Sequence, residues 1–305
     1  VAKVVKQYGC SYVWFGAAAP LALMSKRLKK AGAKRIVALT HGHEVWWSKV
    51  PLFSFAMRIM ARHVDAFTYL GDFTKNAMRP ALGKSAVMVR IAPGIDTQHF
   101  SPGEKNLDLL KKYNLANKKI IVCVGRLVRR KGQDKLIESM PTILQAHPDA
   151  HLLIVGRGKY QEHLKSRAKK LHILQNITFV GRIQFSELPL YIRLGDIFAM
   201  PSRSRYFGLE VEGLGIVYLE ASSCGVPVVA GNSGGAPDAV LEGRTGVVVN
   251  GRKPEAISQG INSLLSDSEL RDAMSKNGRR WAVEEWSWQL WATRFKELLY
   301  SSEVR

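Results

Sequence analysis

The sequence predicts an α/β protein built from two doubly wound, Rossmann-like domains. Short apolar runs rich in β-branched residues alternate with amphipathic stretches along most of the 305 residues. Uniformly apolar strands in such an alternation are typical of parallel sheets covered by helices. The alternation is interrupted once, by a polar segment at 94–118, and a single core rarely grows beyond ~250–300 residues. We therefore expect two domains that face each other across a cleft.

Apolar runs bounded by glycine, proline or polar clusters define the strand candidates, and a period of 3.6 defines the helices. In residues 1–93 the predicted strands are 12–15, 35–40, 66–70 and 86–91. Residues 94–118 are predicted to be a linker with a short helix. In residues 119–283 the predicted strands are 119–124, 151–155, 177–180, 197–200, 226–230 and 246–249, and the helices are 133–145, 160–171, 217–223 and 254–265. Residues 284–305 are predicted to form a C-terminal helix that packs back on the first domain.

The C-terminal region is rich in tryptophan. Trp281, Trp286, Trp288 and Trp291 fall within eleven residues. A helix that is aromatic on one face normally packs on a core, which is the favoured interpretation here. Contact with a membrane or a sugar is the alternative.

The charge is strongly positive and uneven. The net charge is +20, and residues 1–93 hold 15 Lys and Arg against three Asp and Glu. A field of this sign favours anionic partners, namely nucleotides, phospholipid headgroups or nucleic acid.

The cysteines and the start of the chain bear on its setting. Cys10, Cys123 and Cys224 lie far apart and show neither disulfide nor zinc spacing, so we expect a reduced, cytoplasmic protein. The uncharged run 7–25 contains Gly and Pro and fits a strand, a loop and a helix better than a membrane span. The chain enters in what reads as the middle of a domain, so we expect the native protein to begin before Val1.

The first candidate site is a basic, glycine-bounded loop. Gly125, Arg126, Arg130, Lys131 and Gly132 lie between the predicted strand 119–124 and the helix that follows. The helix start offers free amides and a partial positive charge, and Arg and Lys bind phosphate oxygens. The loop therefore indicates a phosphate or diphosphate ligand; a solvated basic loop is the alternative.

The second candidate site contains two glutamates eight positions apart. Glu212 and Glu220 flank Gly213 and Gly215, whose bare amides would approach a ligand closely. Glu220 falls within an apolar helix and would need a partner there, such as the two vicinal hydroxyls of a ribose. Glu212 could bind a hexose in the same way. A helix cap with surface glutamates is the alternative.

The third candidate site is Thr40-His41-Gly42-His43-Glu44, at the end of a predicted strand. His41 is placed to contact a sugar hydroxyl or a developing charge. A metal site with His43 and Glu44, or a plain loop, are the alternatives. No Asp-x-Asp motif occurs, so a metal is not required for a diphosphate.

Two further glycine loops follow predicted strands. Gly156 ends one strand, and Gly181, Arg182 and Ile183 follow another. A single Gly-x-Gly is weak evidence, but both loops fit a pocket for a nucleotide base.

Together these motifs resemble the retaining nucleotide-sugar glycosyltransferases of family four, which have the GT-B fold. The residues that carry the resemblance are Gly125-Arg126-Leu127, Lys131-Gly132, Val155-Gly156, Gly158, Gly181-Arg182, Glu212, Glu220-Ala221, Gly225-Val226-Pro227-Val228, Gly234-Gly235-Ala236-Pro237, Gly243 and Thr245-Gly246. Within the family, the stretches 13–21, 40–45 and 211–220 are most similar to actinobacterial GDP-mannose-dependent mannosyltransferases that extend phosphatidylinositol monomannoside.

The resemblance implies a role for each matching residue. It implies that Arg126 and Lys131 bind the diphosphate and offset the charge of the leaving group, and that His41 contacts the donor sugar and assists at the reacting centre. Glu220 would hold the ribose. Glu212 and the amides of Gly213, Leu214, Gly215, Ile216 and Val217 would hold mannose and diphosphate. Arg182 and Ile183 would lie by the guanine, with Gly125, Arg130 and Gly156 also at the donor. The family's first strand and glycine-rich loop have no counterpart here, so the first domain is expected to be incomplete.

The expected reaction is mannosyl transfer from GDP-mannose to a phosphatidylinositol mannoside, with retention and without a metal or other cofactor. The basic stretch 26–30 and the segment 53–62 mix cations with apolar residues, which favours peripheral binding to an anionic membrane at its inner face; a soluble helix with a charged face is the alternative. A related transferase with a UDP-sugar or another acceptor, an inactive sugar-binding relative and a basic nucleic-acid-binding protein are the rival interpretations. A nucleic-acid partner is not expected, because the aromatic residues are not interleaved with the cations.

Overall fold

The computed structural model describes residues 1–300 and divides into two compact units. The first unit contains residues 1–94 and 205–214 together with the C-terminal stretch from 288. The second contains residues 95–204 and 215–287. The segment 205–214, which the sequence placed within 119–283, therefore groups with the first unit.

The first unit is built on a four-stranded parallel sheet of order β1-β2-β3-β4. Its strands are β1 (Tyr12–Phe15), β2 (Arg35–Ala38), β3 (Ala66–Tyr69) and β4 (Met88–Arg90). The helices of this unit are α1 (Ala2–Tyr8), η1 (Leu21–Met24), α2 (Ser25–Lys30), α3 (Glu44–Lys49), α4 (Pro51–Ala61), α5 (Asp72–Leu82) and α13 (Trp288–Tyr300), while the short η5 (Tyr206–Gly208) lies in the 205–214 segment.

The two faces of this sheet are covered by different helices, because alternate strand residues point to opposite sides. Ile36 belongs to one core with residues from α1, α2, α4 and α5. Its neighbour Val37 belongs to a second core with Leu298 and Leu299 of α13. The Arg35 Nε donates to the Leu298 carbonyl at 2.8 Å. The prediction that the C-terminal helix packs on the first domain is therefore confirmed for residues 288–300; residues 301–305 lie outside the described part.

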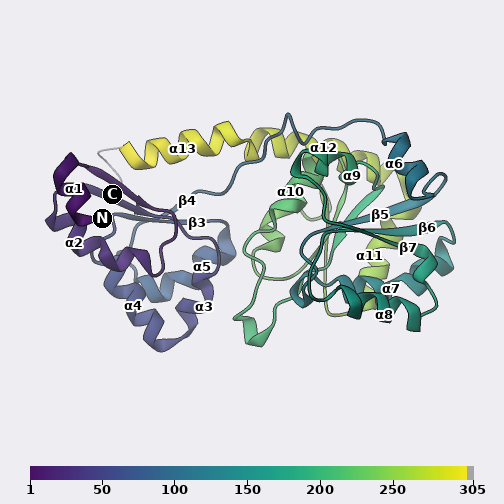
Figure 1. Cartoon of the computed structure of the whole chain (residues 1–305), viewed down its shortest axis with the longest axis horizontal. Helices are drawn as coiled ribbons and strands as arrows, with labels where there is room; N and C mark the ends of the chain where they lie inside the picture. The colour runs from purple at the N-terminus through teal and green to yellow at the C-terminus, as the bar shows by residue number, and fades with distance from the viewer. Residues whose placement is uncertain (301–305) are drawn as a thin grey trace. The chain divides into compact units, whose positions relative to one another are not determined.

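The second unit is built on a six-stranded parallel sheet of order β10-β9-β8-β5-β6-β7. Its strands are β5 (Lys119–Val124), β6 (Ala150–Val155), β7 (Ile177–Gly181), β8 (Ile197–Met200), β9 (Val228–Gly231) and β10 (Gly246–Val249). Its helices are α6 (Leu107–Lys112), η2 (Arg129–Lys131), α7 (Gln133–Ala146), α8 (Gln161–Lys170), η3 (Leu174–Asn176), η4 (Phe185–Glu187), α9 (Leu188–Ile192), α10 (Ile216–Ser223), η6 (Ala236–Ala239), α11 (Pro254–Ser266) and α12 (Ser268–Trp286). Helices α7, α8 and α11 cover one face of this sheet, and α9, α10 and α12 cover the other (Figure 1).

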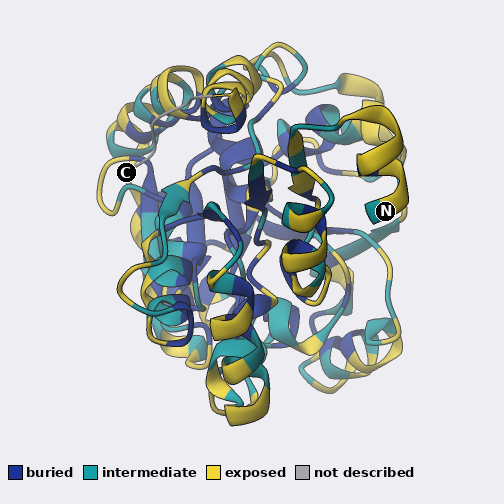
Figure 2. Cartoon of the chain, turned by 90° about the vertical axis from the view of Figure 1, so that its left-hand side faces the viewer, coloured by how far each residue is buried: buried dark blue, intermediate teal, exposed yellow. Residues whose placement is uncertain are grey.

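Burial is greatest along the inner strands. Dark blue in Figure 2 lies mainly along the strands inside the fold, and yellow lies mainly on the outer surfaces of the helices. The strands β1 and β4 of the first unit are mostly intermediate or exposed. Strand β6 is buried along its whole length, as expected for a strand covered by helices on both faces. Within residues 1–300 no helix is long and apolar enough to cross a bilayer.

The predicted strands are confirmed, with ends that differ by up to two residues. The aromatic tail is not one helix, because Ser287 is extended and separates α12 from α13. Trp286 and Trp291 are 1% and 2% exposed, so core packing is confirmed for these two, while Trp288 is 58% exposed. Helix α12 was not predicted.

Candidate functional site

One group of predicted site residues lies in the first unit, where β2 ends. The buried Thr40 bonds to Thr68 of β3 through its amide (3.1 Å) and its hydroxyl (2.8 Å). The His41 amide donates to the Glu44 carboxylate at 3.0 Å, and Glu44 is itself buried. The His41 Nε2 lies 2.5 Å from the Gly16 carbonyl oxygen. Because a carbonyl only accepts, we assign the proton to Nε2, which makes Nδ1 the nitrogen that can accept from a sugar hydroxyl.

The segment that carries Glu212 packs on the His41 loop backbone to backbone. Gly42 has φ +91°, and a Cβ there would come within 2.7 Å of the Gly213 Cα. A Cβ at Gly213 would come within 2.9 Å of the His41 carbonyl oxygen. Only glycine allows this approach at both positions. The structure thereby brings His41, Glu212 and Gly213 together, with Glu212 7% exposed and Leu214 buried.

The tip of the same segment is a turn whose backbone conformation was not predicted from the sequence. Tyr206 and Phe207 have φ of +49° and +54°, a conformation that costs an aromatic residue energy. Their exposures are 62% and 104%. An ion pair of 2.9 Å joins Arg205 and Glu210, which lie on either side of the turn. The nearby Gly208 was the only sequence signal for a turn here.

A second group of site residues lies in the second unit, in the loops after β5 and β6. The Gly125 amide donates to the Val155 carbonyl at 3.0 Å. A Cβ at Gly156 would come within 2.0 Å of the Gly125 carbonyl oxygen, so glycine at 156 permits the two loops to touch. Arg126 is exposed at the start of the basic loop, and Lys131 is half-buried at its end.

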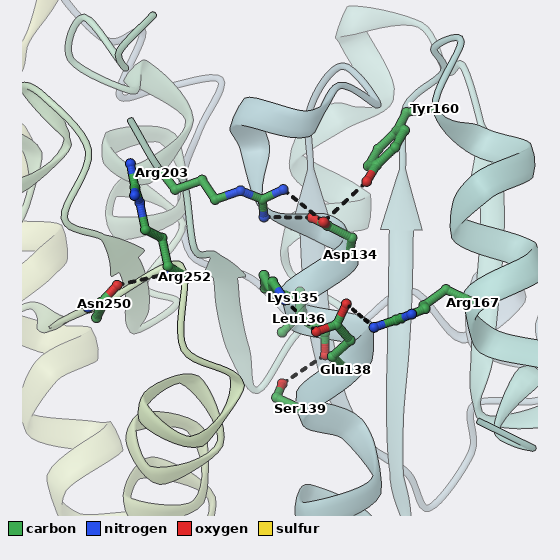
Figure 3. Close-up of polar contacts among 10 residues, drawn as sticks. All are labelled: Asp134, Lys135, Leu136, Glu138, Ser139, Tyr160, Arg167, Arg203, Asn250 and Arg252. Carbon is green, nitrogen blue, oxygen red and sulfur yellow. Dashed lines mark hydrogen bonds and ion pairs between the residues drawn. The ribbon is translucent and has the colours of Figure 1, made fainter. Parts of the chain in front are cut away.

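The basic loop is anchored by a carboxylate that the sequence analysis did not single out. Asp134, in the first turn of α7, accepts two hydrogen bonds of 2.7 Å from the Arg203 guanidinium and one of 3.2 Å from the Tyr160 hydroxyl (Figure 3). Burial alone would raise the pKa of Asp134, but Arg203 and Tyr160 outweigh it and hold that pKa below its usual value. The Arg203 amide also donates to the Arg130 carbonyl at 2.9 Å. These contacts tie together the loops after β5, β6 and β8.

Lys131 and Glu220 lie within electrostatic reach of each other. Glu220 is on α10 and is 7% exposed. Burial raises the pKa of Glu220 from 4.5 to about 7, and the charge of Lys131 acts in the opposite direction. A buried carboxylate of this kind is stabilised by a ligand that donates hydrogen bonds to it.

Helix α10 begins directly at the predicted diphosphate amides. Gly215 is its N-cap residue, with φ +82°, and no side chain caps the helix start within the described residues. Ile216 and Val217 are its first two residues, so their amides belong to the unpaired set at a helix start. Such amides are suited to bind an anion.

Arg182 and Ile183 line a pocket of about 520 Å³ in the second unit. Tyr113 of the segment after α6 and Tyr191 of α9 line the same pocket, and their hydroxyls lie 3.4 Å apart. The Gly156 amide donates to the Gly181 carbonyl at 2.8 Å, which joins the loop after β6 to the end of β7.

The predicted site residues therefore form two groups. The first unit holds His41, Glu212, Gly213 and Leu214, and the second holds Gly125, Arg126, Arg130, Lys131, Gly156, Arg182, Ile183, Gly215, Ile216, Val217 and Glu220. Leu214 and Gly215, the ends of the two groups, are consecutive in the chain. Within residues 1–300 no three His, Cys, Asp or Glu side chains gather to hold a metal ion.

Residues 107–281 match the protein family described as glycosyl transferases group 1. The chain belongs to this family. A curated relative from Mycolicibacterium smegmatis is 45% identical over 97% of this chain and 78% of its own length. It is named GDP-mannose-dependent alpha-(1-6)-phosphatidylinositol monomannoside mannosyltransferase. A relative from Corynebacterium glutamicum, 42% identical over 99% of this chain and 79% of its own, carries the corresponding name for the monoacylated acceptor.

Solved structures of the same fold support the two-unit architecture. The glycosyltransferase HepE of Anabaena, solved with UDP, has a TM-score of 0.83 at 19% identity and matches 98% of this chain and 80% of its own. Sucrose-phosphate synthase from Thermosynechococcus elongatus has a TM-score of 0.81 at 22% identity, over 97% and 74% of the two chains. The predicted GT-B fold, with two Rossmann-like units, is therefore confirmed for this glycosyltransferase.

Proposed function

We propose that this glycosyltransferase moves mannose from GDP-mannose to a phosphatidylinositol mannoside, with retention at the anomeric carbon. The observation that carries the proposal is the 41–45% identity, over nearly the whole chain, to relatives named for this donor and this acceptor. The buried Glu220 beside Lys131 supports it, because a nucleotide sugar offers ribose hydroxyls to the one and phosphate charge to the other.

In this proposal the second unit binds the nucleotide part of the donor. Arg126, Lys131 and the amides of 215–217 bind the diphosphate, Glu220 accepts from the ribose, and the pocket at Arg182 and Ile183 takes the guanine. Glu212 and the amides at 213–214 hold the mannose. Asp134 and Arg203 act as positioning residues, since they bond to each other and Arg203 also bonds to the backbone of the basic loop.

The bond that breaks joins the anomeric carbon to the diphosphate oxygen, and the bond that forms joins that carbon to an acceptor hydroxyl oxygen. Catalysis then depends on stabilising the departing GDP by Lys131, Arg126 and the start of α10, which is a favourable place for negative charge. We infer a same-face route in which the donor phosphate takes the acceptor proton. The His41 Nδ1 accepts from a donor hydroxyl and orients the sugar.

A membrane-binding surface in the first unit suits a lipid acceptor. Leu52, Phe55 and Ile59 are 74%, 61% and 37% exposed, and their spacing places them on one face of α4. Arg58 and Arg62, both exposed, add positive charge to the same helix end. Apolar side chains flanked by cations are typical of helices that lie in an anionic membrane interface.

The exposed turn at 206–207 belongs to the same unit and is tied to the region of α4. The Nζ of Lys49, two residues before α4 begins, donates to the Gly208 carbonyl at 3.0 Å. Tyr206 and Phe207, which are 62% and 104% exposed, add further aromatic surface to this unit. We propose that this surface binds the inner face of the cell membrane peripherally, with the acceptor headgroup presented to the site.

A product assay tests the proposed function. The purified protein is given GDP-mannose or UDP-glucose, with and without phosphatidylinositol monomannoside, and the product is analysed by NMR. The proposal predicts an α-linked dimannoside only from GDP-mannose with the lipid acceptor. Transfer from UDP-glucose alone, or to another acceptor alone, would assign the protein to a different activity within the family.

A further inference from the structure

An apolar pocket in the first unit shares only His41 with the proposed donor site. It has a volume of about 310 Å³ and lies where the ends of β2, β3 and β4 meet α13. The large apolar side chains that line it are Leu39, Leu70, Ile91, Trp288, Trp291 and Phe295. The polar residues on its lining, Thr40 and His41, already bond to Thr68 and Gly16. A polar ligand would therefore find few partners inside this pocket.

The wall formed by α13 is held in place by several contacts. The Phe295 ring packs against Trp14 of β1, with 4.7 Å between ring centroids. Trp291 is buried, and the guanidinium groups of Arg90 and Arg294 lie 5.7 and 4.7 Å from its ring centroid. The pocket is therefore preformed, and exposed cations flank it. An apolar pocket with flanking cations complements an anionic lipid: hydrocarbon inside, phosphate outside.

We propose that this pocket binds a fatty acyl chain of the lipid acceptor. The inference rests on the proposed function, in which the acceptor is a phosphatidylinositol mannoside, and it adds where the lipid part of that acceptor is recognised. His41 lines the pocket and is also the predicted contact of the donor sugar. An acyl chain seated here therefore leads away from the reacting centre while the headgroup remains beside it.

Binding of an acyl chain in this pocket predicts that the KM for the acceptor depends on the length of that chain. Each methylene moved from water into an apolar site is worth about fourfold in affinity. For acceptors short enough to stay monomeric, the KM should fall by about that factor per added methylene until the pocket is full. A KM independent of chain length would overturn the proposal.

A pair of substitutions on α13 provides the direct test. Ala292 and the adjacent Thr293 are both exposed, but only Ala292 lines the pocket. We expect Ala292→Phe to raise the KM for an acylated acceptor at least tenfold and to leave the KM for its deacylated form unchanged. Thr293→Phe should change neither. Equal effects on both acceptors, or no effect of Ala292→Phe, would refute an acyl site.

A binding measurement separates this inference from the proposed function. Bromine on an acyl chain quenches tryptophan at contact, and Trp288 and Trp291 line the pocket. Brominated lysophosphatidylinositol should quench the wild-type and Thr293→Phe proteins and spare Ala292→Phe. Absence of mannosyl transfer together with this pattern would reject the proposed function and keep the acyl site. Equal quenching in all three proteins, or none in the wild type, would reject the acyl site.

Discussion

At the residue scale, Glu220 is the most informative side chain. Its pKa rises from 4.5 to about 7 on burial, so between these values the folded state binds more protons than the unfolded state. Stability is therefore lost as the pH rises from about 5 to above 7. The shift corresponds to about 3 kcal/mol. The unfolding free energies of the wild type and Glu220→Gln are measured without ligand at pH 5 and at pH 8. From pH 5 to pH 8, the wild type should lose about 3 kcal/mol of stability relative to Glu220→Gln.

Donor binding should depend on pH in the opposite direction, because it requires the ionised form of Glu220. A carboxylate that accepts from two ribose hydroxyls must be ionised, so the affinity for GDP-mannose should fall as the pH drops below about 7. The diphosphate of GDP-mannose is esterified at both ends and does not titrate there. Calorimetry should show this loss in the wild type and weak, pH-independent binding for Glu220→Gln. A wild-type affinity that is constant from pH 5 to pH 8 would contradict the role of Glu220.

Asp134 carries a prediction about positioning. Its partner Arg203 has only 13% of its side chain exposed, so Asp134→Asn would leave a largely buried guanidinium without its counter-ion. We expect a loss of about 3 kcal/mol in unfolding free energy. We also expect a higher KM for GDP-mannose, because the basic loop is no longer anchored. Arg167→Ala, which removes an ion pair with Glu138 further along α7, should leave that KM unchanged.

At the element scale, the 206–207 turn keeps an aromatic residue in a left-handed conformation. Phe207→Gly removes this strain and should raise the unfolding free energy by about 1 kcal/mol. The same change removes an exposed ring and should weaken binding to anionic vesicles. Phe185→Gly, an exposed aromatic in the second unit, should not affect vesicle binding. Weaker vesicle binding without a gain in stability would disprove the backbone strain at Phe207. A gain in stability without weaker vesicle binding would disprove its contact with the membrane.

The secondary-structure elements that were predicted correctly are those whose residues show a clear local pattern. The strands are apolar runs, so their positions followed from composition, as at β5 and β8. Helix α12 was missed because few of its residues are buried, which leaves little apolar period to detect. The break at Ser287 was missed because the tryptophans on both sides suggested one continuous face. The grouping of 205–214 with the first unit depends on the Gly42–Gly213 approach, which joins residues far apart in the chain.

The candidate site followed from sequence where glycines and charges sit at strand ends. The basic loop and the glutamate pair were found in this way. The Asp134–Arg203 pair was not, because an aspartate in a first helical turn is common and its partner is 69 residues away. The acyl pocket was not found either, since its walls come from four separate elements.

At the scale of the whole molecule, the positive charge of the first 93 residues should govern membrane binding. Screening lengths shrink from ~8 Å at 0.15 M salt to ~3 Å at 1 M. Binding to phosphatidylinositol vesicles, measured by co-sedimentation, should therefore be strong at low salt and lost at 1 M. Vesicles of neutral lipid should bind weakly throughout. Salt-insensitive binding, or none to anionic vesicles, would contradict a peripheral, charge-assisted attachment.

The proposed stabilisation of the departing GDP depends most on Lys131, the cation that lies near Glu220 at the proposed diphosphate. Removing one group that stabilises the developing charge typically costs 10²–10³ in turnover. The decisive measurement is the kcat for mannosyl transfer by Lys131→Ala, with Lys159→Ala, an exposed cation in the loop after β6, as the control. We predict a loss of about 10²–10³ for the first and near-normal turnover for the second. Near-normal turnover by Lys131→Ala would contradict the stabilisation of the departing diphosphate by this cation.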